Sequence, residues 1–284
     1  MHPEPQHAFC ANKISLLNGS NSITELHSIL FLIHFFQQSF MQPKILIGVP
    51  THEVMESSLS EFIENLKQFS YENFEICIED NSSTTYYFEK LQKIAEEWND
   101  EKKQKFSVIH SNALPKARER IVNARNVLRK KFLEEGFDYF FSLEQDVIPP
   151  INVLETLVSR NEKIISGIYF VPRKKTNGLE IVAYKFAHTN SFNPLNLEPL
   201  NFLELMPSRV IKGLAFSGVG CMLIAREVLE KISFRYDDSL MQSDDYFFGI
   251  DAFKNNYSIC LDSSVLCRHF FDQWFGTKIK LEDY

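Results

Sequence analysis

The amino-acid sequence predicts an α/β protein with a mostly parallel sheet flanked by helices and a smaller sheet region towards the C-terminus. Three observations lead to this prediction. Short apolar runs alternate with amphipathic helical patterns from Lys44 onward, polar residues follow the end of each run, and the alternation loosens after Pro150. Ligands of such sheets bind beyond the carboxyl ends of the strands, so we expect the functional residues there.

Four apolar runs in the first half are typical of strands buried on both faces. They cover residues 45–49, 74–78, 106–109 and 139–143. A helical pattern follows each of the first three runs, and in the first helix the apolar residues are Leu59, Phe62, Ile63, Leu66 and Phe69. This alternation predicts parallel strands joined by right-handed crossovers.

The second half is predicted in less detail. We expect a helix over 153–159, a strand over 163–171, an apolar segment over 181–187 and a loop over 188–207 that carries substrate contacts. Residues 217–232 predict a glycine-containing turn, a short strand and a helix. A last strand over 257–261 leads towards His269. The aromatic residues of the tail after it either stack on a sugar ring of the acceptor or, as we favour, pack the tail onto the domain.

Residues 1–40 differ from the rest of the chain. Residues 2–21 are polar and unpatterned, and the apolar run 29–36 is too short to span a bilayer, so we predict neither a transmembrane segment nor a secretory signal. Met41 stands directly before the first strand. The first forty residues are therefore expected to be an N-terminal extension, either disordered upstream sequence or a peripheral helix, followed by a single domain over 41–284.

The composition limits the partners and the compartment. Of the charged residues, 30 are basic and 37 acidic, which gives a net charge of −7. Such a chain repels nucleic-acid backbones, so any anionic ligand must be bound by local bases, a metal ion or helix N-termini. The five cysteines include no CxxC pair and favour a reducing, cytoplasmic setting over a disulfide framework.

The strongest local signal is the acidic segment that follows the fourth strand. Glu144 and Asp146 lie two residues apart and point to the same side of an extended chain. Two such carboxylates suit Mg²⁺ or Mn²⁺, which prefer oxygen ligands. A solvated acidic turn before Pro149 and Pro150 is the alternative for this segment alone.

Other polar residues stand at matching positions, each with an ordinary structural alternative. Asp80 ends the second strand and suits a base or ribose, or merely a turn. Arginines of the third helix suit a diphosphate, or weak surface pairs. An acidic pair at 244–245 begins a helix, where the helix dipole alone would favour it. His269 follows an apolar strand, where a histidine is usually structural or exposed.

Together, these elements resemble the nucleotide-sugar glycosyltransferases of the GT-A fold, a Rossmann-like α/β architecture, and family 2 in particular. The resemblance runs from about Lys44 to His269. Its matching pieces are Pro50-Thr51, Asp80-Asn81-Ser82-Ser83, Ala124-Arg125-Asn126, Glu144-Gln145-Asp146, the segment 218–226, Asp244-Asp245 and His269.

The resemblance implies a role for each piece on the donor side. Residues 41–150 would bind the nucleotide-sugar, with Pro50 and Thr51 beside it and Asp80 on the nucleoside. Arg125 and Arg118 would approach the diphosphate. Asp146, with Glu144 and His269, would hold Mn²⁺ or Mg²⁺, which neutralises charge on the departing nucleoside diphosphate.

The resemblance also implies an acceptor half over 151–284. Asp245 would be the general base that takes the proton of the acceptor hydroxyl, and Asp244 competes for this role or orients the acceptor. Because no second nucleophile is evident, the reaction would invert the anomeric carbon. The transferred hexose-type sugar, the donor nucleotide and the acceptor, whether glycan, lipid-linked or protein, stay open.

Two alternatives to this function are weighed. Glu144 and Asp244 each replace the more usual acid of the family pattern, which would suit a nucleotide-sugar-binding module that has lost catalysis. A sugar nucleotidyltransferase would carry a glycine-rich basic loop after the first strand, but that position reads GVPTHEVMESS. No GxGxxG motif follows any of the predicted strands, which disfavours a dinucleotide-dependent dehydrogenase.

Overall fold

The computed structural model describes residues 42–270 except 112–113, 174–177, 188–195, 207–208 and 241. The chain divides into two units, Met1–Gln42 and Pro43–Tyr284, and the fold concerns the second. The expectations for the first forty residues, for most of the loop 188–207 and for the aromatic tail lie outside the described residues. Within the described part, no helix has both the length and the apolar character needed to cross a membrane.

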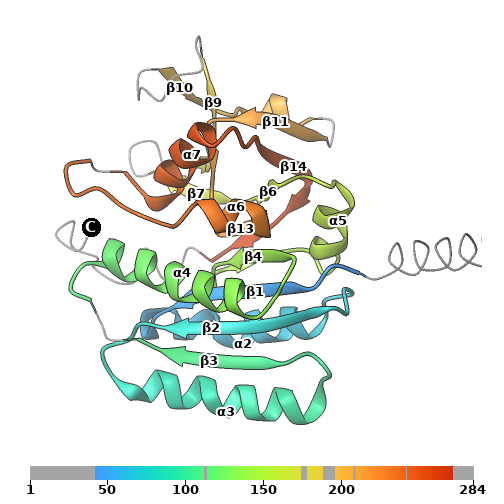
Figure 1. Cartoon of the computed structure of the whole chain (residues 1–284), viewed down its shortest axis with the longest axis vertical. Helices are drawn as coiled ribbons and strands as arrows, with labels where there is room; N and C mark the ends of the chain where they lie inside the picture. Colours follow the sequence, from blue (N-terminus) through green and yellow to red (C-terminus); the bar gives the residue numbers. More distant parts are fainter. Residues whose placement is uncertain are drawn as a thin grey trace, which may run out of the picture. The chain divides into compact units, whose positions relative to one another are not determined.

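A mixed sheet of eight strands, in the order β11-β14-β6-β13-β4-β1-β2-β3, forms the centre of the second unit (Figure 1). Its N-terminal half is parallel, because β1 pairs with β2 and β4, and β2 pairs with β3, all in parallel. These strands are β1 (Ile45–Thr51), β2 (Phe74–Asp80), β3 (Phe106–His110) and β4 (Tyr139–Leu143). The four predicted strands are confirmed, three of them extended by one or two residues at the carboxyl end.

The C-terminal half of this sheet is mixed. Strand β13 runs antiparallel to both β4 and β6, whereas β14 is parallel to β6 and antiparallel to β11. The strands are β6 (Ile164–Ile168), β11 (Val210–Leu214), β13 (Cys221–Ala225) and β14 (Ile259–Leu266). Strand β14, late in the sequence, therefore lies inside the sheet between β11 and β6.

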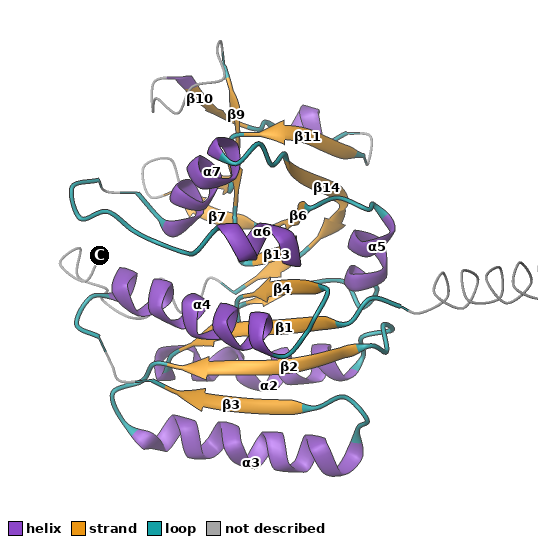
Figure 2. Cartoon of the chain, in the orientation of Figure 1, coloured by secondary structure: helices purple, strands orange, loops and turns teal. Residues whose placement is uncertain are grey.

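Helices cover both faces of the sheet, as Figure 2 shows. One core cluster contains apolar residues of β1 and β2 together with those of α2, α3 and α5, and the other contains those of α4 and α6 with part of α7. The alternation is clear in β1, where Ile45 and Ile47 belong to the first cluster and Leu46 to the second. The helices are η1 (Glu53–Met55), α2 (Glu56–Lys67), α3 (Thr85–Glu101), α4 (Ala117–Glu134), α5 (Val153–Ser159), α6 (Arg226–Lys231) and α7 (Asp244–Lys254).

Three small sheets lie beside the main one, as expected for the C-terminal side. The predicted strand 163–171 is divided into β6 and β7, and the segment 181–187 contributes to β8 and β9. The pairs are β7 (Phe170–Arg173) with β8 (Gly178–Ile181), β9 (Ala183–Phe186) with β10 (Leu197–Pro199) and β12 (Phe216–Ser217), and β5 (Val147–Ile148) with β15 (Arg268–His269). A short 3-10 helix, η3 (Phe202–Leu205), follows β10.

Candidate active site

The backbone brings Asp146 and His269 together at the end of β4. In the β5–β15 pair, His269 stands opposite Val147, and the amide of Phe270 donates to the carbonyl of Asp146 at 2.9 Å. As a result, His269 Nε2 lies 3.3 Å from Asp146 Oδ2, and both side chains are buried. The sequence singled out both residues, and the structure makes them neighbours.

The histidine ring is oriented for ligation. Its Nδ1 donates a hydrogen bond to the carbonyl of Phe170 at 2.8 Å, which leaves Nε2 facing Asp146. Metal-binding histidines commonly use their second nitrogen in this way. Two ligands of one octahedral Mg²⁺ or Mn²⁺ stand about 3 Å apart, close to the observed spacing. Burial lowers the pKa of His269, but the hydrogen bond and charge of Asp146 outweigh it and raise that pKa.

The pair therefore fits a divalent cation, but only as part of a coordination shell. Among the described residues, no group of three or more histidine, cysteine, aspartate or glutamate side chains is arranged to hold a metal. Substrate oxygens and water would have to complete the shell, which is usual for Mg²⁺ at phosphate sites.

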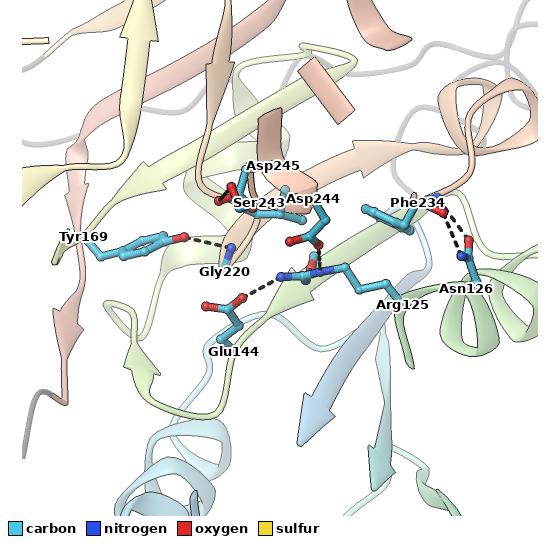
Figure 3. A network of polar contacts seen from close by, with 11 residues as sticks. Arg125, Asn126, Glu144, Tyr169, Gly220, Phe234, Ser243, Asp244 and Asp245 are labelled. Atoms are coloured by element: carbon cyan, nitrogen blue, oxygen red, sulfur yellow. Dashed lines mark hydrogen bonds and ion pairs between the residues drawn. The ribbon is translucent and has the colours of Figure 1, made fainter. Parts of the chain in front are cut away.

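The guanidinium of Arg125, a residue of α4, is surrounded by three polar side chains, two of which, Glu144 and Asp244, are labelled in Figure 3. Nη1 donates to Ser142 Oγ at 2.6 Å, Nη2 to Glu144 Oε1 at 2.5 Å and Nε to Asp244 Oδ2 at 2.7 Å. The side chain is 1% exposed. Each of the three guanidinium nitrogens thus donates to an acceptor inside the protein. These hydrogen bonds fix α4, β4 and α7 relative to one another.

In the structure, the guanidinium of Arg125 therefore bridges two acids of the site, Glu144 and Asp244. The resemblance suggests contact with a diphosphate for this residue, and that role stays a prediction. The next residue, Asn126, exchanges two hydrogen bonds with the backbone of Phe234, at 2.8 and 3.1 Å. Both residues of the motif thus anchor elements that lead to the acidic pair of α7.

The two acids at the start of α7 have different surroundings. Asp244 is buried and points at Arg125, whereas Asp245 is half-buried and accepts a hydrogen bond from the amide of Val219 at 3.2 Å. Burial and the charges of Asp244 and Glu144 raise the pKa of Asp245 to about 8, although Arg125 opposes them. The pKa of Glu144 is raised as well. Burial is the main cause, the charge of Arg125 opposes it, and the charge of Asp146 adds to it.

Asp80 lies at the ends of β2 and β3, away from this cluster along the sheet edge. Its Oδ1 accepts from the amide of Ser82 at 3.1 Å and from the Ser82 hydroxyl at 2.5 Å, and its Oδ2 lies 2.9 Å from His110 Nδ1. Asp80 is fully buried, and the His110 side chain is 26% exposed. Burial and the charge of Arg120 lower the pKa of His52, and the charges of Glu53 and Asp80 oppose this lowering only in part.

Thr51 contacts the acidic segment through Gln145. The Thr51 hydroxyl donates to Gln145 Oε1 at 2.5 Å, and the Tyr87 hydroxyl donates to the same oxygen at 2.8 Å. Gln145 Nε2 donates in turn to the carbonyl of Met55 at 2.7 Å. The glutamine between the two acids is therefore buried, with both its amide oxygen and its amide nitrogen hydrogen-bonded. It fixes a turn at residues 145–146, so the predicted extended chain through Glu144 and Asp146 is wrong.

The remaining expected donor-side residues are placed as follows. Pro50 is buried in β1 opposite Glu79. Arg118, near the start of α4, donates to the carbonyl of Leu240 at 2.9 Å, and Lys116 contacts Asp238 at 3.1 Å. These contacts tie the segment before α7 to the N-terminal end of α4.

Sequence reasoning missed Tyr169, whose hydroxyl accepts a hydrogen bond from the amide of Gly220 at 3.1 Å (Figure 3). In the sequence it is one aromatic residue within an apolar run. The only signal was indirect, in the closely spaced Gly218 and Gly220, where a Cβ atom would collide with this tyrosine.

Comparisons with known proteins agree on the kind of fold. The family model described as Glycosyl transferase family 2 matches residues 46–233. No curated protein matches the chain. Among solved structures, GalNAc-T7 with UDP, GalNAc and Mn²⁺ is similar, with a TM-score of 0.57 and 14% identity over 85% of this chain and 47% of that one.

Two further solved structures share the architecture. A mannosyltransferase from Pyrobaculum calidifontis in complex with GDP-Man and Mn²⁺ has a TM-score of 0.52 and 14% identity. This match covers 87% of this chain and 66% of the mannosyltransferase chain. TarS residues 1–349 from S. aureus has a TM-score of 0.50 and 15% identity. This match covers 82% of this chain and 62% of the TarS chain. The chain thus spans about half to two thirds of these structures' lengths.

Proposed function

Since the chain belongs to glycosyl transferase family 2 and has a GT-A fold, we propose that it moves a sugar from a nucleotide-sugar to an acceptor hydroxyl with the help of a divalent cation. The observation that carries this proposal is the buried pair of Asp146 and His269 at the end of β4, 3.3 Å apart. The proposal includes a cytoplasmic setting, which the free thiols of the four described cysteines support.

Asp146 and His269 are the residues proposed to hold Mn²⁺ or Mg²⁺, with Glu144 beside them. The ion would act as a Lewis acid on the two phosphates and stabilise the departing nucleoside diphosphate. Two of the similar structures contain Mn²⁺ together with UDP or GDP-Man, which supports this type of donor and ion. Asp80, with its partners His110 and Ser82, is proposed to bind the nucleoside.

Asp245 is proposed as the general base. Of the two acids at the start of α7, it is the more accessible, since Asp244 is engaged with Arg125. The acceptor oxygen would form a bond to the anomeric carbon as the bond to the phosphate oxygen breaks, and its proton would pass to Asp245. This single displacement inverts the anomeric carbon.

The base must be ionised to act, whereas burial and nearby acids raise the pKa of Asp245 to about 8. The charges of Asp244 and Glu144 contribute to that rise. Compensation of the negative charge around Glu144 by a bound cation lowers the pKa of Asp245 again. The site is thus expected to acquire its working base when the donor complex is in place.

The same raised pKa favours a second candidate, a nucleotide-sugar-binding module without catalysis. If Asp245 keeps its proton in the donor complex, the acceptor hydroxyl has no base. This candidate predicts nucleotide-sugar binding that depends on Asp146 but no turnover with any acceptor, and an Asp245→Asn variant that behaves like the wild type.

The test uses the full chain with Mn²⁺ and a panel of UDP-, GDP-, CMP- and dTDP-sugars, and measures release of the nucleotide, a nucleoside diphosphate or, for a CMP-sugar, CMP. We expect slow hydrolysis or transfer with one donor, lost in Asp146→Asn and reduced by about 100-fold or more in Asp245→Asn. Asp251→Asn is the matched control, because Asp251 lies on the same helix but pairs with Arg235. If the folded wild type binds no donor, the proposal is wrong.

A further inference from the structure

Tyr169 contacts two parts of the candidate site at once. It lies between β6 and β7, is 6% exposed, and has its ring on the His269 side and its hydroxyl beside Gly220. Figure 3 shows the hydroxyl pointing into the space between Glu144 and Asp245. Burial and the charges of these two acids raise the pKa of the Tyr169 phenol, so it stays protonated.

The ring of Tyr169 fixes the orientation of His269. The two ring centroids are 5.3 Å apart, with the planes at 72°, in an edge-to-face contact. The next residue, Phe170, accepts the hydrogen bond of His269 Nδ1. Two consecutive residues therefore hold the imidazole, one through the edge-to-face ring contact and one through a hydrogen bond to Nδ1, with Nε2 towards Asp146.

The hydroxyl of Tyr169 fixes the turn over residues 218–220. It accepts from the amide of Gly220 at 3.1 Å, while the amide before it, that of Val219, donates to Asp245 Oδ1 at 3.2 Å. The carbonyl of Gly220 accepts from the amide of Glu144 at 2.9 Å. One short turn thus links the tyrosine, the proposed base and the acid after β4.

The turn is built around the phenol. A Cβ atom on Gly218 would overlap the Tyr169 hydroxyl, and one on Gly220 would lie 2.9 Å from that hydroxyl and 2.6 Å from Glu144 Oε2. Neither glycine has a left-handed backbone, since the described glycines with positive φ are Gly136 and Gly213. Space for the tyrosine and Glu144, rather than turn geometry, therefore explains these two glycines.

We propose that Tyr169 is a positioning residue with two separable roles in the reaction. Its hydroxyl holds the turn that places the base Asp245, and its ring holds His269 as a metal ligand. This inference rests on the proposed function, and it adds a residue that acts through others and does not touch the reacting atoms itself.

The test compares two substitutions of Tyr169. Tyr169→Phe removes the hydroxyl and keeps the ring, so we expect kcat to fall by about 10- to 100-fold, with the affinity for Mn²⁺ unchanged. Tyr169→Leu removes the ring as well, so we expect the Mn²⁺ affinity to fall by about tenfold or more in addition. Affinity is measured by calorimetry with Mn²⁺ and the nucleotide of the donor panel, UDP, GDP, CMP or dTDP, that the wild type binds most tightly.

Gly218→Ala tests the hydroxyl role by a second route, because its methyl group displaces the phenol tip and should reproduce the kcat loss of Tyr169→Phe. Tyr71→Phe is the matched control. The Tyr71 hydroxyl donates to the carbonyl of Pro43 at 2.7 Å, and this residue is equally buried but lies outside the site. Tyr169→Met replaces the leucine variant if that variant does not fold in a thermal melt.

The outcomes separate this inference from the proposed function. A wild type that binds no Mn²⁺ with any nucleotide of the donor panel overturns both. A wild type that binds Mn²⁺ and turns over while Tyr169→Phe keeps its full kcat overturns the hydroxyl role. Equal Mn²⁺ affinity in the phenylalanine and leucine variants overturns the ring role, and an equal kcat loss in Tyr71→Phe shows a merely structural effect.

Discussion

The two acidic regions at the edge of the sheet differ in how their charge is compensated. At the end of β2, Asp80 has a local donor or partner for each oxygen, from Ser82 and His110. Around β4 and α7, Glu144, Asp244 and Asp245 lie about a single guanidinium, that of Arg125 (Figure 3). The carboxylate of Asp80 thus has its partners without a ligand, whereas the second region carries excess negative charge that suits a cation-bearing substrate complex.

The largest effect that this comparison predicts is the loss of the shared guanidinium. Arg125→Met leaves the buried Asp244 and the half-buried Glu144 without their counter-charge, so we expect the free energy of unfolding to fall by about 3–5 kcal/mol in urea titrations. The control is Arg235→Met, which breaks the more exposed pair with Asp251 and should cost less than about 1 kcal/mol. Equal costs for the two variants would contradict the contrast between the regions.

A smaller effect of opposite sign is expected when one acid of the crowded region is neutralised. Folded Asp245 keeps its proton up to about pH 8, whereas the unfolded residue loses it near its ordinary value of 3.8. The folded state thus holds more protons between these values, and wild-type stability falls as pH rises through this window. Asparagine does not titrate, so Asp245→Asn removes this decrease in the free energy of unfolding. We therefore expect the variant to become more stable than the wild type by about 1–2 kcal/mol at pH 8.

The measurement is thermal or urea unfolding in metal-free buffer at several pH values. The stability difference between Asp245→Asn and the wild type should grow from about pH 4 to pH 8 and then level off. A difference that does not depend on pH would show that Asp245 is ionised in the free protein, and that Arg125 suffices for all three acids.

The smallest stability effect is expected at Asp80, whose two oxygens have local partners. Asp80→Asn keeps an acceptor for Ser82 and alters the contact with His110, so the unfolding free energy should fall by only about 1 kcal/mol. The change should be visible instead in nucleoside diphosphate binding by calorimetry, with a loss of affinity of about tenfold. If Asp80→Asn destabilises the protein as much as Arg125→Met does, the two regions do not differ in the way described.

The parallel half of the fold could be predicted from sequence because its signals are local. Each strand is a continuous apolar run, and the polar residues that end it, such as Asp80 and Asp146, were identified as site residues for that reason. The C-terminal half depends on pairings between distant segments. The division of one apolar run into β6 and β7 and the pairing of β5 with β15 follow from partners that local patterns do not specify.

The site shows the same limit. Arg125 follows Ala124 directly and stands four residues after Ile121, so its position beside the apolar stripe of α4 hinted at burial. Its partner Asp244 is contributed by a helix far along the chain, and no local pattern pairs the two. Tyr169 was indistinguishable from a core aromatic residue, because its function depends on contacts with Gly220 and His269 from two other segments.

The place of β14 inside the sheet has a consequence for how the molecule is made. Until residues 259–266 leave the ribosome, β6 and β11 lack the neighbour that joins them, and the ladder that carries His269 does not exist. Contacts of such long sequence separation form late and slowly. A nascent or truncated chain would therefore expose an open sheet edge, and Asp146 and His269 would become neighbours only after the last strand is inserted.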